Sequence, residues 1–153
     1  MRFQFVDIEK SYPKALPKLK EIADKYKKTR PGFEATYELG NLFMDHEQPN
    51  KAFEWYDRAA ESAPSQYEKS LALIASAASL ENVFEYQKAL ERVDQALAIG
   101  VSSLKGEVLL SKARTLQGMK KIPDAKKIYD QVVTDFPNTS HAKKAEIFRA
   151  QIQ

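Results

Sequence analysis

Small and apolar residues recur along this chain with a helical period and also at a nearly constant longer spacing. Three pairs of a small residue followed four positions later by a larger apolar one stand 37 and 36 residues apart: Ala52/Tyr56, Ala89/Val93 and Ala125/Tyr129. Residues four apart share one face of a helix, and two helices approach closely only where side chains are small. The pattern therefore predicts a series of similar helix pairs.

Apolar periodicity and turn residues together predict the helices. They span residues 14–29, 32–46, 50–63, 66–82, 86–99, 103–117, 123–135 and 139–152. Residues typical of helix ends agree: Pro31, Pro49 and Pro123 for first turns, Gly100 and Gly118 for stops, and Ser65, Ser102 and Asn138 for caps. We expect a single all-α domain with an N-terminal helical cap over 1–32, repeats at 33–66, 70–103 and 106–139, and a C-terminal capping helix over 140–153.

Composition narrows the class of protein. The chain is 43% hydrophobic and 29% charged, as soluble folded proteins are, and it has no cysteine for a disulfide or a thiol nucleophile. Its most apolar stretch, residues 71–80, is ten residues long, whereas a membrane span needs roughly 18. Asp7 comes before any long apolar region, unlike a secretory signal. We expect attachment to a membrane only through an anchor outside the printed chain.

Charge is distributed unevenly along the sequence. Residues 1–32 carry nine Lys/Arg and four Asp/Glu, residues 33–103 carry five and twelve, and residues 104–153 carry ten and five. The net charge of +3 therefore hides basic ends and an acidic middle. Solvated helix faces explain such ends in most proteins. The functional alternative is an electrostatic contact with an acidic partner or with lipid headgroups.

Few residues of the sequence suggest catalysis or metal binding. Asp45, His46 and Glu47 could be drawn as metal ligands, but adjacent residues at a helix end point in different directions, and His141 lies far along the chain. The sequence holds no Gly-rich phosphate loop, no G-x-S-x-G and no H-E-x-x-H. The sequence therefore predicts no enzyme: no catalytic residue, no metal site and no cofactor.

Nucleic acid is also a disfavoured partner. Lysine doublets stand at 120–121, 126–127 and 143–144, but Asp124, Asp130 and Asp135 lie among them. The doublets also lack the interleaved exposed aromatic residues on which a single-strand binder stacks bases. Protein or peptide partners remain the favoured class.

The repeat resembles the tetratricopeptide repeat, a unit of about 34 residues with W-x2-L-G-x2-Y, then A-x3-F, then P. Residues 33–66 match best. Motif residues stand at Leu39, Gly40, Ala52, Ala59 and Pro64, with Thr36, Phe43 and Tyr56 replacing the aromatic positions. The later units keep most of these residues, although Val101 replaces the second proline. The resemblance implies a right-handed α-solenoid of about three helix pairs that binds proteins or extended peptides in a concave groove.

In that family, fixed positions on the first helix of each repeat line the groove. Here they fall on Tyr37, Asn41, Met44, Ile74, Ala78, Glu81, Leu110, Arg114 and Gln117. Packing under the terminal helices is an equal alternative for Tyr37, Met44 and Leu110. A subclass that clamps acidic chain termini would place its Lys, Asn and Arg at Tyr37, Asn41, Ala75, Glu107 and Ser111, where only Asn41 matches. Cytosolic chaperone tails are therefore disfavoured ligands.

A closer resemblance covers nearly the whole chain. Residues 16–26, 35–40 and 104–112 are similar to the YfgM-like proteins of Gram-negative bacteria, and the string LKGEVLLSK at 104–112 is the most specific of the three. This family implies a single-span inner-membrane protein with a periplasmic domain that assists the secretory translocon together with a periplasmic chaperone. The FPNT sequence at 136–139 is similar to repeats of envelope proteins that assist outer-membrane assembly or cell-wall synthesis.

Two functions therefore follow from the sequence. The first is a non-catalytic scaffold of the bacterial cell envelope, on the periplasmic face of the inner membrane if an upstream anchor exists. The alternative is a soluble cytoplasmic adaptor or a self-associating scaffold, suggested by the missing anchor and the basic–acidic–basic charge layout.

Overall fold

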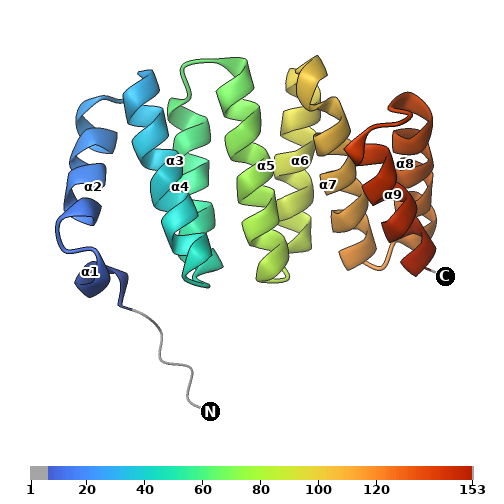
Figure 1. Cartoon of the computed structure of the whole chain (residues 1–153), viewed down its shortest axis with the longest axis horizontal. Helices are drawn as coiled ribbons and strands as arrows, with labels where there is room; N and C mark the ends of the chain where they lie inside the picture. Colours follow the sequence, from blue (N-terminus) through green and yellow to red (C-terminus); the bar gives the residue numbers. More distant parts are fainter. Residues whose placement is uncertain (1–6, 153) are drawn as a thin grey trace, which may run out of the picture.

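The computed structural model describes residues 7–152, which fold into a row of packed helices (Figure 1). The eight predicted helices are present: α2 (Ala15–Lys25), α3 (Arg30–Asp45), α4 (Pro49–Ser62), α5 (Gln66–Asn82), α6 (Tyr86–Ile99), α7 (Lys105–Gly118), α8 (Ile122–Asp135) and α9 (Ser140–Gln151). Two short elements were not predicted, α1 (Ile8–Ser11) and the 3-10 helix η1 (Ser102–Leu104). The predictions for residues 1–6 and 153 lie outside the described residues.

Each helix packs against its neighbours in sequence, from α2 at one end to α9 at the other (Figure 1). Alternate helices also meet: α3 contacts α5, α5 contacts α7, and α7 contacts α9. The contacts between α4, α6 and α8 are less extensive. A two-row stack bends toward the row whose members approach one another, so α3, α5, α7 and α9 form the inner row and α4, α6 and α8 the outer one.

The small residues of the repeat lie where the two rows meet, as predicted. Ala52, Ala89 and Ala125 are all fully buried. Gly40 shows why a small residue is needed, because a Cβ atom there would lie 2.5 Å from the Tyr56 ring. The larger partners Tyr56, Val93 and Tyr129 are at most 4% exposed and fill the space beside these contacts.

Helix ends follow the expected chemistry with two corrections. Pro31, Pro49 and Pro123 occupy first turns, and Gly100 ends α6 with a left-handed backbone. The side chains of Thr29, Ser65 and Thr139 accept backbone N–H groups at the starts of α3, α5 and α9. Ser102 lies within η1 instead, and Asn138 precedes the cap with a positive φ of 63°. Asn138 therefore lies one residue before the cap of α9, and Ser102 is separated from α7 by the rest of η1.

A series of aspartates ties each repeat to the next. Asp57 on α4 accepts two bonds of 2.9 Å from Arg92 on α6 and one of 2.7 Å from Ser76 on α5. Aspartates stand at the equivalent positions one and two repeats later. Asp94 on α6 accepts a bond from Lys112 on α7, and Asp130 on α8 accepts one from Arg149 on α9. Charged hydrogen bonds of this kind fix direction as well as distance, so they help to set the angle between successive repeats.

Candidate functional site: the inner face of the helix stack

The inner row carries all nine residues predicted to line a groove. Eight of them are partly exposed, so their side chains reach the inner surface. Leu110 is the exception and a correction, because it is only 1% exposed. It packs in the core with Leu116 and Tyr129, among others. Leu110 therefore stabilises the third repeat and offers no surface to a partner.

Aromatic rings fill the N-terminal half of the inner face. Tyr37 lies between Phe33 and Tyr56, with ring centroids 5.6 and 5.1 Å away. The Tyr56 hydroxyl donates a hydrogen bond of 2.7 Å to Oδ1 of Asn41. Burial raises the pKa of Tyr37 and of Tyr56 above the ordinary phenol value, so both hydroxyls stay protonated. Met44 packs against the same core, so the groove positions of this half are engaged in contacts within the protein.

The C-terminal half of the inner face is hollow. A pocket of about 600 Å³ is lined by Ala78, Glu81, Asn82, Tyr86, Arg114, Gln117, Gly118, Phe148 and Gln151. We call this pocket the inner hollow. Four of the predicted groove residues line it: Ala78, Glu81, Arg114 and Gln117. The structure thus brings these four together, whereas Tyr37, Asn41 and Met44 belong to the filled half.

The charges within the inner hollow compensate one another. Arg114 Nε lies 3.3 Å from Glu81 Oε2, and the Thr115 hydroxyl donates a bond of 2.7 Å to the other oxygen of Glu81. The Tyr129 hydroxyl donates to Oε1 of Gln117 at 2.9 Å, and burial raises the pKa of Tyr129 to about 12. The amide NH2 group of Gln117 remains available to a ligand. The hollow is therefore polar but carries no net charge.

Five residues of the inner hollow were not predicted as groove residues. Asn82 and Gly118 are the last residues of α5 and α7. Tyr86 comes from α6, and Phe148 and Gln151 come from α9, whereas the repeat pattern assigns the groove to the first helix of each pair. One signal was available at Gly118, which was interpreted only as a helix stop. A Cβ atom at Gly118 would lie 2.1 Å from the Tyr86 ring, so the glycine is what lets Tyr86 reach the inner face.

The positions of a carboxylate clamp hold other chemistry. Glu107 pairs with His141 Nε2 at 3.4 Å, and the hydroxyl of Ser111 is buried without a hydrogen-bond partner. Asn41, the one matching residue, is engaged by Tyr56. A carboxylate and a buried hydroxyl thus stand where the subclass has cations, so electrostatics oppose capture of a terminal carboxylate.

The histidine considered for metal binding is engaged in local contacts. His46 Nδ1 lies 2.9 Å from the carbonyl oxygen of Leu42, and Nε2 lies 3.4 Å from the Tyr12 hydroxyl. The Tyr12 and His46 rings also meet edge to face, with centroids 5.4 Å apart. Among residues 7–152, no three His, Asp or Glu side chains gather as a metal-binding group. His46 therefore links the start of the chain to the end of α3.

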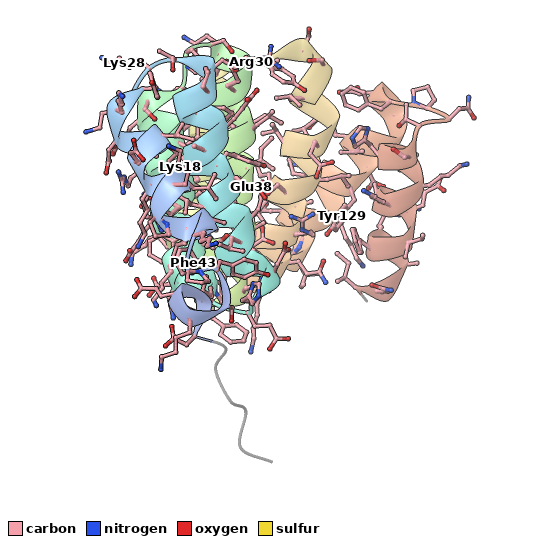
Figure 2. The ribbon with its side chains drawn as sticks, turned by 60° about the vertical axis from the view of Figure 1, so that its left-hand side comes forward. Lys18, Lys28, Arg30, Glu38, Phe43 and Tyr129 are labelled. Carbon is pink, nitrogen blue, oxygen red and sulfur yellow. The ribbon has the colours of Figure 1, made fainter. Side chains whose placement is uncertain are left out.

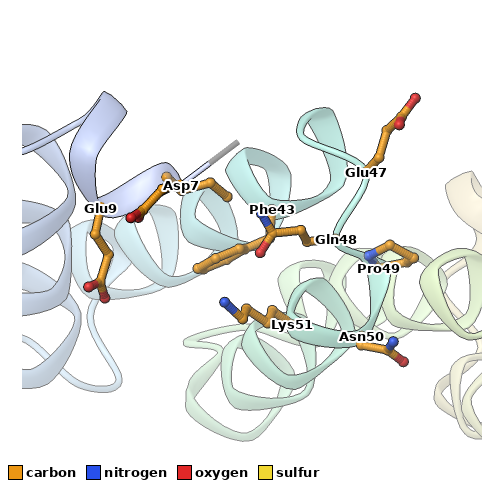
Figure 3. Close-up of a pocket in the computed structure, with 9 residues that line it drawn as sticks. Asp7, Glu9, Phe43, Glu47, Gln48, Pro49, Asn50 and Lys51 are labelled. Atoms are coloured by element: carbon orange, nitrogen blue, oxygen red, sulfur yellow. The ribbon is translucent and has the colours of Figure 1, made fainter. Parts of the chain in front are cut away.

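A second hollow, also of about 600 Å³, lies between α1 and the turn that joins α3 to α4 (Figure 3). Asp7 and Glu9 line one side of it, and Glu47, Asn50 and Lys51 are on the other. The ammonium group of Lys51 lies 5.5 Å from the centre of the Phe43 ring. This hollow was not expected from the sequence, because α1 was not predicted.

The basic ends of the sequence lie at opposite ends of the stack. Figure 2 shows Lys18 and Lys28 at the α2 end, and Lys143 and Lys144 are exposed on α9. Some of these charges are paired locally, as in the contact of 3.3 Å between Lys18 and Glu21. Exposed pairs of this kind contribute little to stability. Within the part of the chain that the structure describes, no helix combines the length and the hydropathy needed to cross a membrane.

Comparison with known proteins identifies the fold. No protein-family model matches the chain, and no curated protein matches its sequence. Solved tetratricopeptide-repeat (TPR) structures do match. The TPR domain of Arabidopsis OM64 superposes with a TM-score of 0.64 and 19% identity over 78% of this chain and 94% of that one. The second TPR domain of human RPAP3, solved in complex with an HSP70 peptide, gives 0.62 and 17% over 76% and 91%.

A third structure covers more of the chain. It holds the nearly identical TPR-like repeats of a putative kinesin light chain from Podosopora anserina, and it superposes with a TM-score of 0.76 and 14% identity. The match covers 95% of this chain and 76% of that one. These similarities agree with the helix pairs, the buried small residues and the curved inner row. The chain therefore has the tetratricopeptide-repeat fold, an all-α solenoid.

Proposed function

We propose that this protein is a non-catalytic interaction scaffold that binds an extended segment of a partner protein along its inner face, with the inner hollow as the main contact. The single observation that carries this proposal is the hollow itself. Its volume of about 600 Å³ falls within the usual range of ligand pockets, roughly 300 to 1,000 Å³. Repeat solenoids present such concave surfaces to extended ligands, and the similar RPAP3 domain was solved with a peptide bound.

The chemistry of the hollow indicates what the partner offers. Glu81 and Arg114 neutralise each other, so neither is free to attract a charged residue from a distance. Asn82, Gln117 and Gln151 supply side-chain amides, which pair well with the N–H and C=O groups of an extended backbone. The proposed partner is thus a neutral stretch of polypeptide held partly through its main chain.

A matched pair of substitutions tests this function. The wild-type protein is used to select binders from a phage library of random peptides of about 12 residues, which span about 40 Å when extended. Ala78→Arg fills the inner hollow, whereas Ala98→Arg adds the same side chain at an exposed position on α6. Selected peptides should lose binding to Ala78→Arg and keep it with Ala98→Arg. Failure to select any peptide, or equal binding to both variants, would remove the groove from the account.

We also propose that the scaffold works in the bacterial envelope, in the manner of the YfgM-like proteins that assist the secretory translocon with a periplasmic chaperone. The support is the similarity of residues 16–26, 35–40 and 104–112 to that family. The test is to sequence the genomic DNA upstream of the codon for Met1. An apolar span of about 20 residues encoded there supports the periplasmic placement, whereas a start codon at Met1 without such a span favours the cytoplasmic adaptor.

Self-association is the weaker alternative because of charge. The two ends that would meet in a head-to-tail stack both carry exposed lysines, at Lys18 and Lys28 on one side and Lys143 and Lys144 on the other. Like charges brought together oppose association, most strongly at low salt, where screening is weakest. Sedimentation at low salt should therefore show a monomer, and an oligomer under that condition would contradict the proposal.

A further inference from the structure

Phe84 is the most exposed large apolar side chain among residues 7–152. Its exposed fraction is 77%, compared with 57% for Ile147 and 47% for Tyr67. It lies in the turn that joins α5 to α6, at a backbone φ of 61°. This is the left-handed region, which a bulky residue adopts only at a cost. Both the exposure and the backbone therefore oppose a phenylalanine at this position.

The same turn occurs in all three repeats, so the fold provides its own comparison. Glu47, Phe84 and Lys120 occupy equivalent positions with φ values of 56°, 61° and 60°. In each turn, the residue after the left-handed one donates its N–H to a carbonyl near the end of the preceding helix. These bonds, of 2.8 to 2.9 Å, run from Gln48 to Phe43, from Glu85 to Leu80 and from Lys121 to Leu116. The same left-handed backbone conformation thus occurs in three turns, and the residue that adopts it is polar in two of them. Folding of the turn therefore does not require Phe84.

Phe84 stands beside the inner hollow. Its ring meets the Tyr86 ring edge to face, with centroids 6.2 Å apart. Tyr86 in turn lines the hollow and lies against Gly118, where no side chain intervenes. Phe148 contributes a further ring from α9. An exposed aromatic side chain is thus in contact, through Tyr86, with the inner hollow.

We infer that Phe84 and Tyr86 form an aromatic anchor at the edge of the inner hollow, which takes an uncharged apolar side chain of the extended peptide. This inference rests on the proposed function and adds a specificity-determining contact to it. Aromatic side chains that pack against an apolar residue near a pocket supply much of the binding energy of protein interfaces. The compensated pair of Glu81 and Arg114 favours an uncharged side chain, because a charged one would be desolvated without a free partner.

The test uses the peptides selected on the wild-type protein. Asparagine tolerates the left-handed backbone better than other non-glycine residues do, so Phe84→Asn removes the ring without disturbing the turn. Tyr67→Asn is the matched control, since Tyr67 is another exposed aromatic residue, near the start of α5. We expect Phe84→Asn to weaken peptide binding about tenfold or more, the usual loss at an interface hot spot, and to raise the urea midpoint of unfolding. Tyr67→Asn should leave peptide binding unchanged. The selected peptides should also share an aromatic or aliphatic residue.

Three results would overturn the inference, and they are distinguishable. Peptides that lose binding to Ala78→Arg but keep it with Phe84→Asn would leave the scaffold in place without the anchor. Peptides that bind Ala78→Arg normally, or no selected peptides at all, would remove the scaffold proposal as well. A wild-type dimer that Phe84→Asn converts to a monomer would show that a second copy of the chain, not a peptide, covers Phe84.

Discussion

The two halves of the inner face differ although they are built from the same repeat. In the N-terminal half, Tyr37 stacks between Phe33 and Tyr56, and the groove position Asn41 is bonded to Tyr56. In the C-terminal half, small residues stand at Ala78 and Gly118, and a hollow of about 600 Å³ remains. One half uses its groove residues for packing, whereas four groove residues of the other half line an open hollow.

This difference shows why a groove cannot be assigned from repeat positions alone. Position five of the repeat carries Tyr37 in the first unit and Leu110 in the third, and both serve mainly to pack. The hollow exists instead because small residues, Ala78 and Gly118, line it. A substitution in the filled half should therefore affect unfolding, and one in the hollow half should affect binding.

The largest expected effect is a difference in unfolding free energy between a substitution in the filled half and one in the hollow half. Tyr56→Ala should cost about 3 to 5 kcal/mol of unfolding free energy, because it empties a buried site that Gly40 and Tyr37 enclose. Tyr86→Ala should cost about 1 to 2 kcal/mol, since the Tyr86 ring is only partly buried. Urea denaturation followed by circular dichroism measures both. Equal costs would contradict the distinction between the filled half and the hollow half.

A second prediction concerns the contact between the rows in the middle repeat. Ala89→Leu should lower the unfolding free energy by about 1 to 3 kcal/mol, because Ala89 is fully buried and the added methyl groups have no space. Ala98→Leu, at an exposed site on α6, should change it by less than about 0.5 kcal/mol. An unchanged urea midpoint for Ala89→Leu would show that the two rows do not meet there.

Tyr129 provides a pH-dependent test in the hollow half. Tyr129→Phe removes the bond to Gln117 and should cost about 0.5 to 1.5 kcal/mol at neutral pH. Burial raises the pKa of Tyr129 from 10.0 to about 12, so the unfolded chain releases this proton first as the pH rises. The contribution of the raised pKa is complete below pH 10 and is lost as the pH rises through 12.

The measurement for Tyr129 is the difference in unfolding free energy between wild type and Tyr129→Phe, taken from pH 8 to about 12. The advantage of the wild type should shrink, then vanish, over the upper part of this range. A difference that stays constant with pH would show that the phenol titrates alike in the folded and unfolded chain.

The smallest effect compares the three equivalent turns. Glycine has no Cβ penalty at positive φ, so Glu47→Gly, Phe84→Gly and Lys120→Gly should each raise the unfolding free energy, by about 0.5 to 1 kcal/mol. The three gains should be similar, because the backbone angles are similar. Only Phe84→Gly should also reduce peptide binding. A loss of stability for Phe84→Gly alone would show that its ring supports the fold.

Much of the fold could be predicted from the sequence because the repeat places small residues where helices must approach. Ala52, Ala89 and Ala125 determined the helix pairs correctly, and Pro31, Pro49 and Pro123 located three helix starts. The unpredicted elements, α1 and η1, are a single turn each and too short to show periodicity. The proposed domain limits and the envelope role stay predictions.

The site could be predicted only in part. Ala78, Glu81, Arg114 and Gln117 follow from repeat positions, and the structure places them around one hollow. Tyr86, Phe148 and Gln151 do not, because Tyr86 belongs to the second helix of its pair and the other two belong to the capping helix, outside the first-helix positions that the repeat assigns to the groove. The prediction that Leu110 lines the groove was wrong for a related reason, since its burial is decided by packing against distant residues such as Tyr129.

Binding of a peptide in the inner hollow can be observed residue by residue by NMR. A selected peptide is added to the isotope-labelled protein, and the change in each backbone amide signal is recorded. We expect the largest changes at residues of the hollow such as Ala78, Gln117 and Phe148, with smaller ones at Tyr37 in the filled half. Changes centred on the outer row, at Trp55 or Arg92, with none in the hollow, would contradict it.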